Sequence, residues 1–126
     1  MRKALLAAAL ATLTTPAMAG ELWNVMEGPQ GLTAGVWNIE RTAGGFTGSA
    51  TMRGGDGRPV IYTVVGTIDG PAFTAKRQAP SDGQICTYSG TLEPPKADRK
   101  GFEVKGSASC RQGSGIWRVL EAKPAR

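Results

Sequence analysis

Hydrophobic and polar residues alternate along most of the chain in short runs, and turn residues separate these runs. β-Branched and aromatic residues come in short runs between the turn residues, and within many of these runs apolar side chains recur at every second position, which is the period of a strand with one buried face. Beyond the N-terminal region, no window of a dozen residues carries a 3.6-residue apolar period. The pattern predicts an all-β domain with strands at 22–27, 34–41, 45–53, 58–68, 72–77, 84–92, 101–110 and 115–122.

Glycine-rich turn signals fall between the predicted strands. Asp-Gly pairs begin at residues 56, 69 and 82, an even spacing of thirteen. One strand plus one turn fills such an interval, so the spacing predicts a meander of hairpins. We interpret these aspartates as turn residues rather than metal ligands, because they do not form a D-x-D-x-D loop and successive turns point to opposite ends.

The turns also predict which residues face each other in neighbouring strands. Large side chains then lie opposite small ones, which allows a strongly curved sheet to fill a narrow interior. A turn at 54–57 gives the pairs Met52–Val60, Ala50–Tyr62, Gly48–Val64 and Phe46–Gly66. A two-residue Asp69-Gly70 turn gives Ile68–Pro71, Gly66–Phe73 and Val64–Ala75. Pairing the two cysteines gives Cys86–Cys110, Tyr88–Ala108, Gly90–Gly106 and Leu92–Val104.

The alternation divides the strand residues into an inward and an outward set, as expected for one dry and one wet face. The expected inward residues are Phe46, Ala50, Met52, Val60, Tyr62, Val64, Ile68, Phe73, Tyr88, Leu92, Phe102, Val104 and Ala108. The expected outward residues are Thr47, Ser49, Thr51, Thr63, Thr67, Thr87, Ser89, Glu103, Lys105, Ser107 and Ser109.

The predicted architecture is a small antiparallel up-and-down meander barrel of seven to eight strands. With eight strands the first and the last run antiparallel and can pair, which removes exposed edges. The alternative is an open β-sandwich of seven strands.

The first nineteen residues have the features of a cleaved secretory signal peptide. Arg2 and Lys3 precede a short apolar stretch, and Ala17-Met18-Ala19 is the small-x-small pattern that signal peptidase accepts. The alternative is an N-terminal amphipathic helix of the fold. Cleavage near Ala19 leaves a single domain at 20–126, and we expect the protein to be periplasmic or secreted, of a bacterial type.

Composition narrows the possible chemistry. The 126-residue chain contains no histidine, which excludes Ser-His-Asp and Cys-His catalysis and any histidine-ligated metal. Its formal charge is +5, and loss of Arg2 and Lys3 lowers this to +3, which does not favour nucleic-acid binding. No segment approaches 20 apolar residues, so we expect no membrane span. We expect no cofactor and no metal.

Cys86 and Cys110 are the only two cysteines. In an oxidising compartment an intramolecular disulfide is the expected state, and closing a loop of this size stabilises by about 3–4 kcal/mol in the loop-entropy model. The alternative, a reactive thiol pair, lacks the C-x-x-C spacing.

Gly35-Val36-Trp37 opens a strand near the mature N-terminus and resembles the G-x-W of the calycin group. That group includes lipocalins, avidins and small bacterial metalloprotease inhibitors. The resemblance implies a meandering antiparallel barrel and, in the larger members, a ligand in its mouth. From the residues alone, we expect Trp37 to plug the closed end of the barrel, with its indole N–H bonded to a carbonyl.

Strand direction places the loops at 54–57, 78–83 and 111–114 at one end of the barrel. We expect a binding rim there that engages a protein partner or an anionic group, since arginine binds carboxylate and phosphate in a bidentate fashion. The alternative is that these are solvated charges paired locally with Asp56 and Asp82. The candidate rim residues are Arg53, Arg58, Arg77, Asp82 and Arg111.

Four aromatic residues are candidates for the interior: Trp37, Tyr62, Tyr88 and Trp117. Eight strands enclose enough space for side chains or for one small ligand, so these residues either fill the core or line a cavity. Neither G-x-S-x-G nor S-x-x-K is present, and we expect no enzyme. The predicted function is an exported binding module of the inhibitor or accessory-subunit type, and the alternative is a small-ligand carrier.

Overall fold

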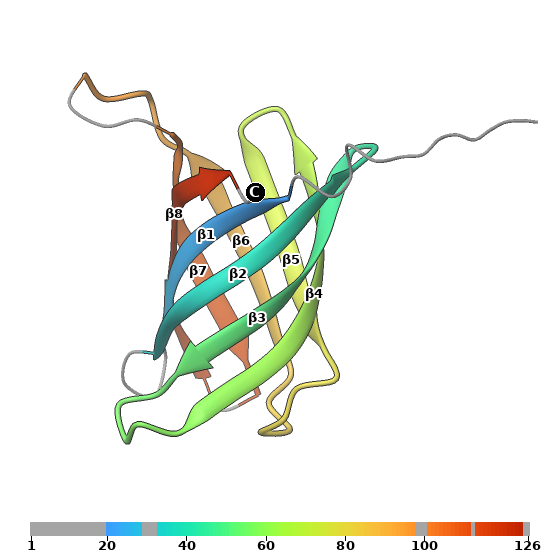
Figure 1. The fold of residues 1–126 in the computed structure, drawn as a ribbon, viewed down its shortest axis with the longest axis vertical. Coiled ribbons are helices and arrows are strands. Elements are labelled where there is room, and N and C mark those ends of the chain that lie inside the picture. The colour runs from blue at the N-terminus through green and yellow to red at the C-terminus, as the bar shows by residue number, and fades with distance from the viewer. Residues whose placement is uncertain (1–19, 29–32, 98–100, 112, 125–126) are drawn as a thin grey trace, which may run out of the picture.

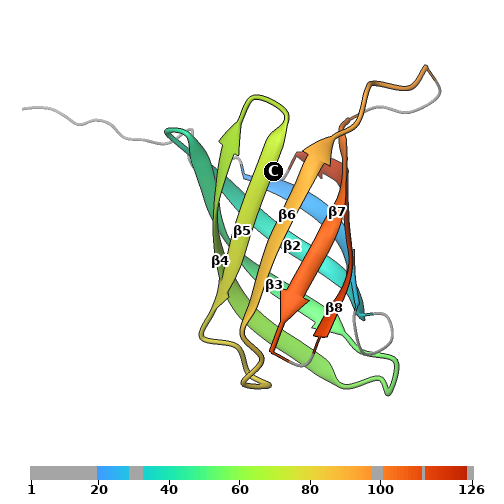
Figure 2. The same ribbon diagram turned by 180° about the vertical axis from the view of Figure 1, so that it is seen from behind.

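The computed structural model is a closed barrel of eight antiparallel strands connected in chain order (Figures 1 and 2). It describes residues 20–28, 33–97, 101–111 and 113–124. The predicted signal peptide lies outside the described residues. The strands are β1 (Glu21–Glu27), β2 (Thr33–Thr42), β3 (Gly45–Arg53), β4 (Pro59–Asp69), β5 (Ala72–Gln78), β6 (Cys86–Leu92), β7 (Glu103–Cys110) and β8 (Gly113–Pro124).

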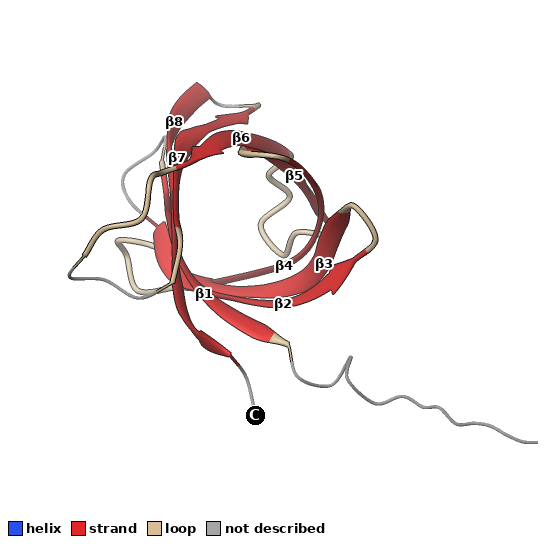
Figure 3. Ribbon diagram, turned by 90° about the horizontal axis from the view of Figure 1, so that it is seen from above, coloured by secondary structure: helices blue, strands red, loops and turns tan. Residues whose placement is uncertain are grey.

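Closure of the barrel confirms the predicted architecture and rules out the open sandwich. β1 pairs with β8 in an antiparallel ladder, and every other strand pairs with its neighbours in the sequence. The ring is visible along the barrel axis in Figure 3. Pairing the first strand with the last satisfies the backbone groups that an open sheet leaves at its edges.

The predicted register is confirmed in two hairpins and is wrong in one. All four pairs expected between β3 and β4, and all four between β6 and β7, are present. Between β4 and β5, Asp69 pairs with Ala72, so Gly70 and Pro71 form the turn in place of Asp69 and Gly70. Gly70 has a φ of 59°, and a positive φ at the first central position is where a two-residue hairpin turn requires glycine. Val64 therefore faces Arg77 rather than Ala75.

Most of the predicted inward residues form the core, which also contains Trp23, Val25, Ile39 and Val119. Val60, Ile68 and Phe102 are partly buried against it. Leu92 is an exception with 36% exposure, because it is the last residue of β6 and lies beyond the packed interior.

The predicted outward residues are exposed with one exception, Glu103, which is buried. Its position in β7 is on the outer face, opposite in phase to Val104. Arg118 Nη2 lies 2.7 Å from one carboxylate oxygen of Glu103, and Lys96 Nζ lies 3.6 Å from the other. These long cationic side chains cover Glu103 on the outside of the barrel.

The narrow interior depends on large residues facing small ones. A Cβ atom at Gly66 would lie 2.2 Å from Cζ of Phe46, so the Phe46 ring occupies the space that glycine leaves. Trp23 and Trp37 are direct partners across β1 and β2. Ring centroids are 6.3 Å apart for Trp23 and Trp37, and 5.8 Å apart for Trp37 and Trp117. Aromatic rings thus run through the barrel, and side chains fill its centre.

Candidate functional site

Three of the predicted rim arginines are exposed at the predicted end of the barrel. Strands β3, β5 and β7 all run toward this end, which is the lower end in Figure 1. Arg53, Arg58 and Arg111 are exposed there. Arg53 Nη1 donates to the Gly57 carbonyl, and Arg58 Nε lies 3.9 Å from Asp56 Oδ2. The local pairing of arginine with Asp56 that the alternative interpretation predicts is thus present, but the two groups are 3.9 Å apart and exposed to solvent.

Arg77 lies at the predicted end of the barrel but is buried there, unlike the other three predicted rim arginines. Its side chain is only 6% exposed and points into the barrel. The reason is the strand phase, since Phe73, Ala75 and Arg77 all occupy inward positions of β5. An arginine buried in this way requires a partner that balances its charge.

Glu27 is that partner, and the sequence analysis did not identify it. It is the last residue of β1 and is 1% exposed. One carboxylate oxygen, Oε1, accepts from Arg77 Nη2 at 2.9 Å and from the Tyr88 hydroxyl at 2.8 Å. The other, Oε2, accepts from the Tyr62 hydroxyl. Three donors therefore satisfy a carboxylate that is shielded from water.

The two tyrosines extend this network into the aromatic core. Tyr62 accepts a hydrogen bond from Trp37 Nε1 at 3.1 Å, and Tyr88 accepts one from Arg77 Nε at 2.7 Å. The expected carbonyl partner of Trp37 is thus wrong: the Tyr62 hydroxyl lies within reach inside the barrel, whereas strand carbonyls are used in the ladders. Arg77 Cζ also lies 4.2 Å from the centroid of the Tyr62 ring. We call Glu27, Arg77, Tyr62 and Tyr88 the charge cluster.

Burial and the Glu27 carboxylate shift the pKa values of the other three members of the charge cluster. Burial, followed by the nearby negative charge of Glu27, raises the pKa of both Tyr62 and Tyr88 above the ordinary tyrosine value. Burial alone would lower the pKa of Arg77, but Glu27 and the two tyrosines together outweigh it, and that pKa is raised. The cluster therefore consists of a charged Arg77 and two protonated phenols that act as donors.

The loop 79–85 is attached to the charge cluster through Asp82. Arg77 Nη1 lies 3.3 Å from Asp82 Oδ1 and 3.4 Å from Oδ2. The Asp82 Oδ1 atom also accepts from the Gln84 backbone N–H at 3.0 Å, which forms the turn. Seen along the barrel axis in Figure 3, the tan loop that follows β5 lies within the outline of the ring. Arg77 thus connects the buried interior to an exposed loop at the rim.

Two exposed isoleucines are associated with this loop, one as a hydrogen-bonded neighbour and one as its last residue. Ile61 on β4 and Ile85 before β6 have exposures of 52% and 53%, the highest among the exposed large hydrophobic residues of the described chain. Ser81 joins the loop to Ile61, because its N–H donates to the Ile61 carbonyl at 2.8 Å and its Oγ accepts from the Ile61 N–H at 3.0 Å. On the other side, the Arg111 N–H donates to the Ile85 carbonyl at 3.3 Å.

All four predicted interior aromatics, Trp37, Tyr62, Tyr88 and Trp117, are buried. Trp117 faces Glu27 across the β1–β8 ladder, and its ring centroid lies 5.2 Å from that of Tyr88. Its Nε1 is buried and finds no hydrogen-bond partner among the described residues. Buried donors are nearly always paired, so this N–H is an unused polar group beside the charge cluster.

A signal for Glu27 and Arg77 was present in the sequence. Trp23, Val25 and Glu27 alternate on one face of β1, just as Phe73, Ala75 and Arg77 do on β5. Each run places a charged residue in the inward phase at the same end of the barrel. Opposite charges in such positions predict a buried ion pair.

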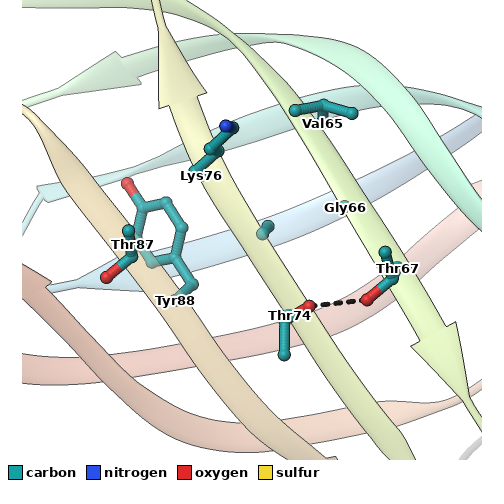
Figure 4. Close-up of a pocket in the computed structure, with 8 residues that line it drawn as sticks. Val65, Gly66, Thr67, Thr74, Lys76, Thr87 and Tyr88 are labelled. Carbon is teal, nitrogen blue, oxygen red and sulfur yellow. Dashed lines mark hydrogen bonds between the residues drawn. The ribbon is translucent and has the colours of Figure 1, made fainter.

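Shallow hollows occur on the outer surface. One lies over β4, β5 and β6, where the hydroxyls of Thr67 and Thr74 are 2.6 Å apart and Lys76 and Val65 border the depression (Figure 4). Within the described part of the chain, no three acidic or sulfur side chains are grouped as a metal site would require. Nor do the described residues contain a helix long and apolar enough to cross a bilayer.

Comparisons with known proteins support the fold alone. No protein-family model matches the chain, and no curated protein matches it. Among solved structures, the barrel is similar to a de novo designed fluorescence-activating β-barrel, with a TM-score of 0.58 and 16% identity over 87% of this chain and 100% of that one. It is also similar to a redesigned β-barrel, mFAP1, bound to DFHBI, with a TM-score of 0.62 and 14% identity over 83% of this chain and 95% of that one.

Proposed function

We propose that this chain is an exported binding module that engages a protein partner through one end of its barrel. The observation that carries this proposal is the pair of exposed isoleucines at the loop 79–85: Ile61, which is hydrogen-bonded to Ser81 of the loop, and Ile85, the last residue of the loop. Exposed apolar side chains close to arginines are typical of protein-binding surfaces. We call Ile61, Ile85, Arg58, Arg111 and the loop 79–85 the binding rim.

The filled interior supports an external binding surface. The rings of Trp23, Trp37 and Trp117 and the charge cluster occupy the space that an internal ligand would need. The charge cluster also holds the loop from inside through the contact between Arg77 and Asp82.

The proposal is tested by affinity capture from periplasmic extract with matched variants. The rim variant carries Ile61→Asp and Ile85→Asp. The control carries Val36→Asp and Leu92→Asp, which place the same charges on two exposed hydrophobic residues outside the binding rim. We expect one or more proteins to be retained by the wild type and the control but lost with the rim variant. The proposal would be contradicted if all three proteins retained the same partners equally, or if the wild type retained no protein beyond those that the rim variant retains.

Charge reversal tests the electrostatic part of the binding rim. Arg58→Glu with Arg111→Glu is expected to slow association and to reduce its dependence on salt, because exposed rim charges act mainly on the encounter rate. Unchanged binding at low ionic strength would show that these arginines lie outside the contact.

A second candidate function is a small-ligand carrier. The unused N–H of Trp117 favours it, as does the resemblance of Gly35-Val36-Trp37 to the calycins. The similar redesigned barrel is described as bound to DFHBI. Native mass spectrometry of the exported protein discriminates between the two functions, since a carrier would retain a small molecule of defined mass and a partner module would not.

A further inference from the structure

We propose that Arg77 is a recognition site for a carboxylate group of the partner, and that Asp82 occupies this site in the free protein. The inference rests on the proposed function, because the partner that docks on the binding rim would carry the carboxylate. The partner would then present an acidic side chain flanked by apolar residues. Binding would exchange an internal carboxylate for an external one on the same guanidinium.

The two sides of the Arg77 guanidinium differ in how well they are satisfied. On the inner side, Nε donates to Tyr88 at 2.7 Å and Nη2 donates to Glu27 at 2.9 Å. On the outer side, Nη1 reaches Asp82 only at 3.3 and 3.4 Å, which is longer than a normal charge-assisted hydrogen bond. The inner contacts hold the arginine in place, and the outer contact leaves room for a better acceptor.

The position of Asp82 favours its displacement from Arg77 by another carboxylate. Its side chain is 33% exposed, and its loop begins with Ala79, whose φ of 49° lies in the left-handed region. Alanine disfavours this region because its Cβ atom crowds the backbone. In the described residues Ala79 is the only non-glycine with a positive φ. The closed loop is therefore strained, and its opening would relieve the strain and expose Arg77.

The chemistry of the site favours a carboxylate over a more highly charged anion. Glu27 already lies against the inner side of Arg77 and accepts from Nη2. A carboxylate replaces Asp82 with the same charge and the same planar shape. A doubly charged phosphate would add further negative charge close to a buried carboxylate, which the low-dielectric interior disfavours.

The surroundings of Asp82 match an acidic residue within an apolar segment. Ser81, next to Asp82, is hydrogen-bonded to Ile61, and Ile85 lies three residues after Asp82 with its carbonyl hydrogen-bonded to the Arg111 backbone N–H. Apolar neighbours of the incoming carboxylate would contact the isoleucines. The exposed arginines would attract the acidic segment before it docks.

The experiment removes the internal competitor and supplies a small carboxylate as the probe. Asp82→Asn deletes the charge but keeps the Oδ1 acceptor that caps the Gln84 N–H. Asp56→Asn is the matched control, since Asp56 also belongs to an Asp-Gly turn and its Oδ1 accepts from the Arg58 N–H at 2.9 Å. The probe is sodium benzoate at constant ionic strength, and uncharged benzamide is its control. Nitrogen–proton NMR follows the Arg77 Nε–H and the Trp117 indole N–H.

We expect benzoate to shift the Arg77 signal of Asp82→Asn with a half-saturation at least tenfold lower than for the wild type. A tethered carboxylate competes at an effective concentration on the order of millimolar, so the wild type binds free benzoate weakly. Asp56→Asn should behave as the wild type does, and benzamide should shift neither signal.

Equal responses of Asp82→Asn and Asp56→Asn, or equal shifts with benzoate and benzamide, would overturn the assignment of Arg77 as a carboxylate site. Should Asp82→Asn fail to fold, Asp82→Ser removes the charge and retains a turn-forming oxygen. The probe needs no partner, so this result is separate from the capture experiment.

The capture experiment then identifies the source of the carboxylate. If the carboxylate belongs to the partner, Asp82→Asn retains the rim-dependent protein more strongly than Asp56→Asn does. Benzoate binding with equal retention of the partner by the two variants would overturn the partner as the source and point to a free small acid.

Discussion

The two ends of β1 carry the same chemistry in opposite environments. Glu21 at its start pairs with Arg41, and Glu27 at its end pairs with Arg77. The Arg41 side chain is about half exposed at the barrel mouth, whereas Glu27 and Arg77 are buried in a network of hydroxyl and indole donors. A solvent-exposed ion pair contributes little to the free energy of folding. Removing one member of a buried pair leaves an unpaired buried charge and strongly destabilises the protein.

The surroundings of the two pairs differ in the same way. Glu21 accepts from Trp23 Nε1 at 2.9 Å, and Arg41 covers the rings of Trp23 and Phe102. That end is closed mainly by apolar packing. At the other end a guanidinium and two phenols close the barrel and attach the loop 79–85. This difference fits the proposed function, in which the second end would bind the partner and the first end would serve folding alone.

The largest effect is expected from a comparison of Glu27→Gln with Glu21→Gln. Glu27→Gln leaves the buried Arg77 charge without its carboxylate, and we expect a loss of about 3–5 kcal/mol in the free energy of unfolding. Glu21→Gln acts on a partly exposed pair and should lose less than about 1 kcal/mol. Urea unfolding of the two variants measures both values. Equal losses would show that burial does not distinguish the two ends.

The next largest effect is expected from the disulfide, which lies at the same end of the barrel as the charge cluster. Cys86 follows Ile85, Cys110 precedes Arg111, and the sulfurs are bonded. Replacing both cysteines by alanine should lower the free energy of unfolding by about 3.5 kcal/mol in the loop-entropy model. Unfolding of the wild type with and without reductant gives the same comparison. An unchanged unfolding midpoint on reduction would mean that the barrel ladders alone hold this end.

A smaller difference in stability is expected between phenylalanine variants of two buried tryptophans. Trp37→Phe removes the donor to the Tyr62 hydroxyl, whereas Trp117→Phe removes an N–H that has no partner in the described structure. Both variants lose similar apolar contact, so Trp37→Phe should be the less stable by about 1–2 kcal/mol. Thermal unfolding of the two variants checks this order. The reverse order would indicate that the Trp117 N–H is satisfied in solution.

Much of the fold could be predicted from the sequence, because the relevant signals are local. The alternation of side chains fixed which face of each strand is buried, and the register of two hairpins followed from their turns. The register of the Asp69–Ala72 hairpin was mispredicted by two residues, because Gly70 is required at the first central position of the turn. A register change of two residues keeps the same side chains on the inner face, so the predicted core residues of these strands were still correct.

The charge cluster was harder to predict, because its members lie far apart in the chain. Glu27, Tyr62, Arg77 and Tyr88 come from four different strands. A charged residue is expected outside unless its partner is known, and only the closed barrel brings the partners together. Arg53, Arg58 and Arg111 were easier to place, since strand direction alone assigns their loops to one end.

The most direct test of the charge cluster is an alkaline absorbance titration of the tyrosines. Tyr62 and Tyr88 are the only two tyrosines in the chain, so the tyrosinate signal reports on the cluster alone. Free tyrosine has a pKa of about 10. Because the pKa of each buried tyrosine is raised in the folded state, the folded protein should show no tyrosinate near pH 10.

The unfolded chain releases these two protons first, so the stability present below about pH 10 is lost as the pH rises further. The expected slope reaches about 2.7 kcal/mol per pH unit for two protons. We predict that tyrosinate absorbance appears only together with the loss of β-sheet circular dichroism. Reversible ionisation of either tyrosine near pH 10, in a barrel that remains folded, would contradict the buried charge cluster.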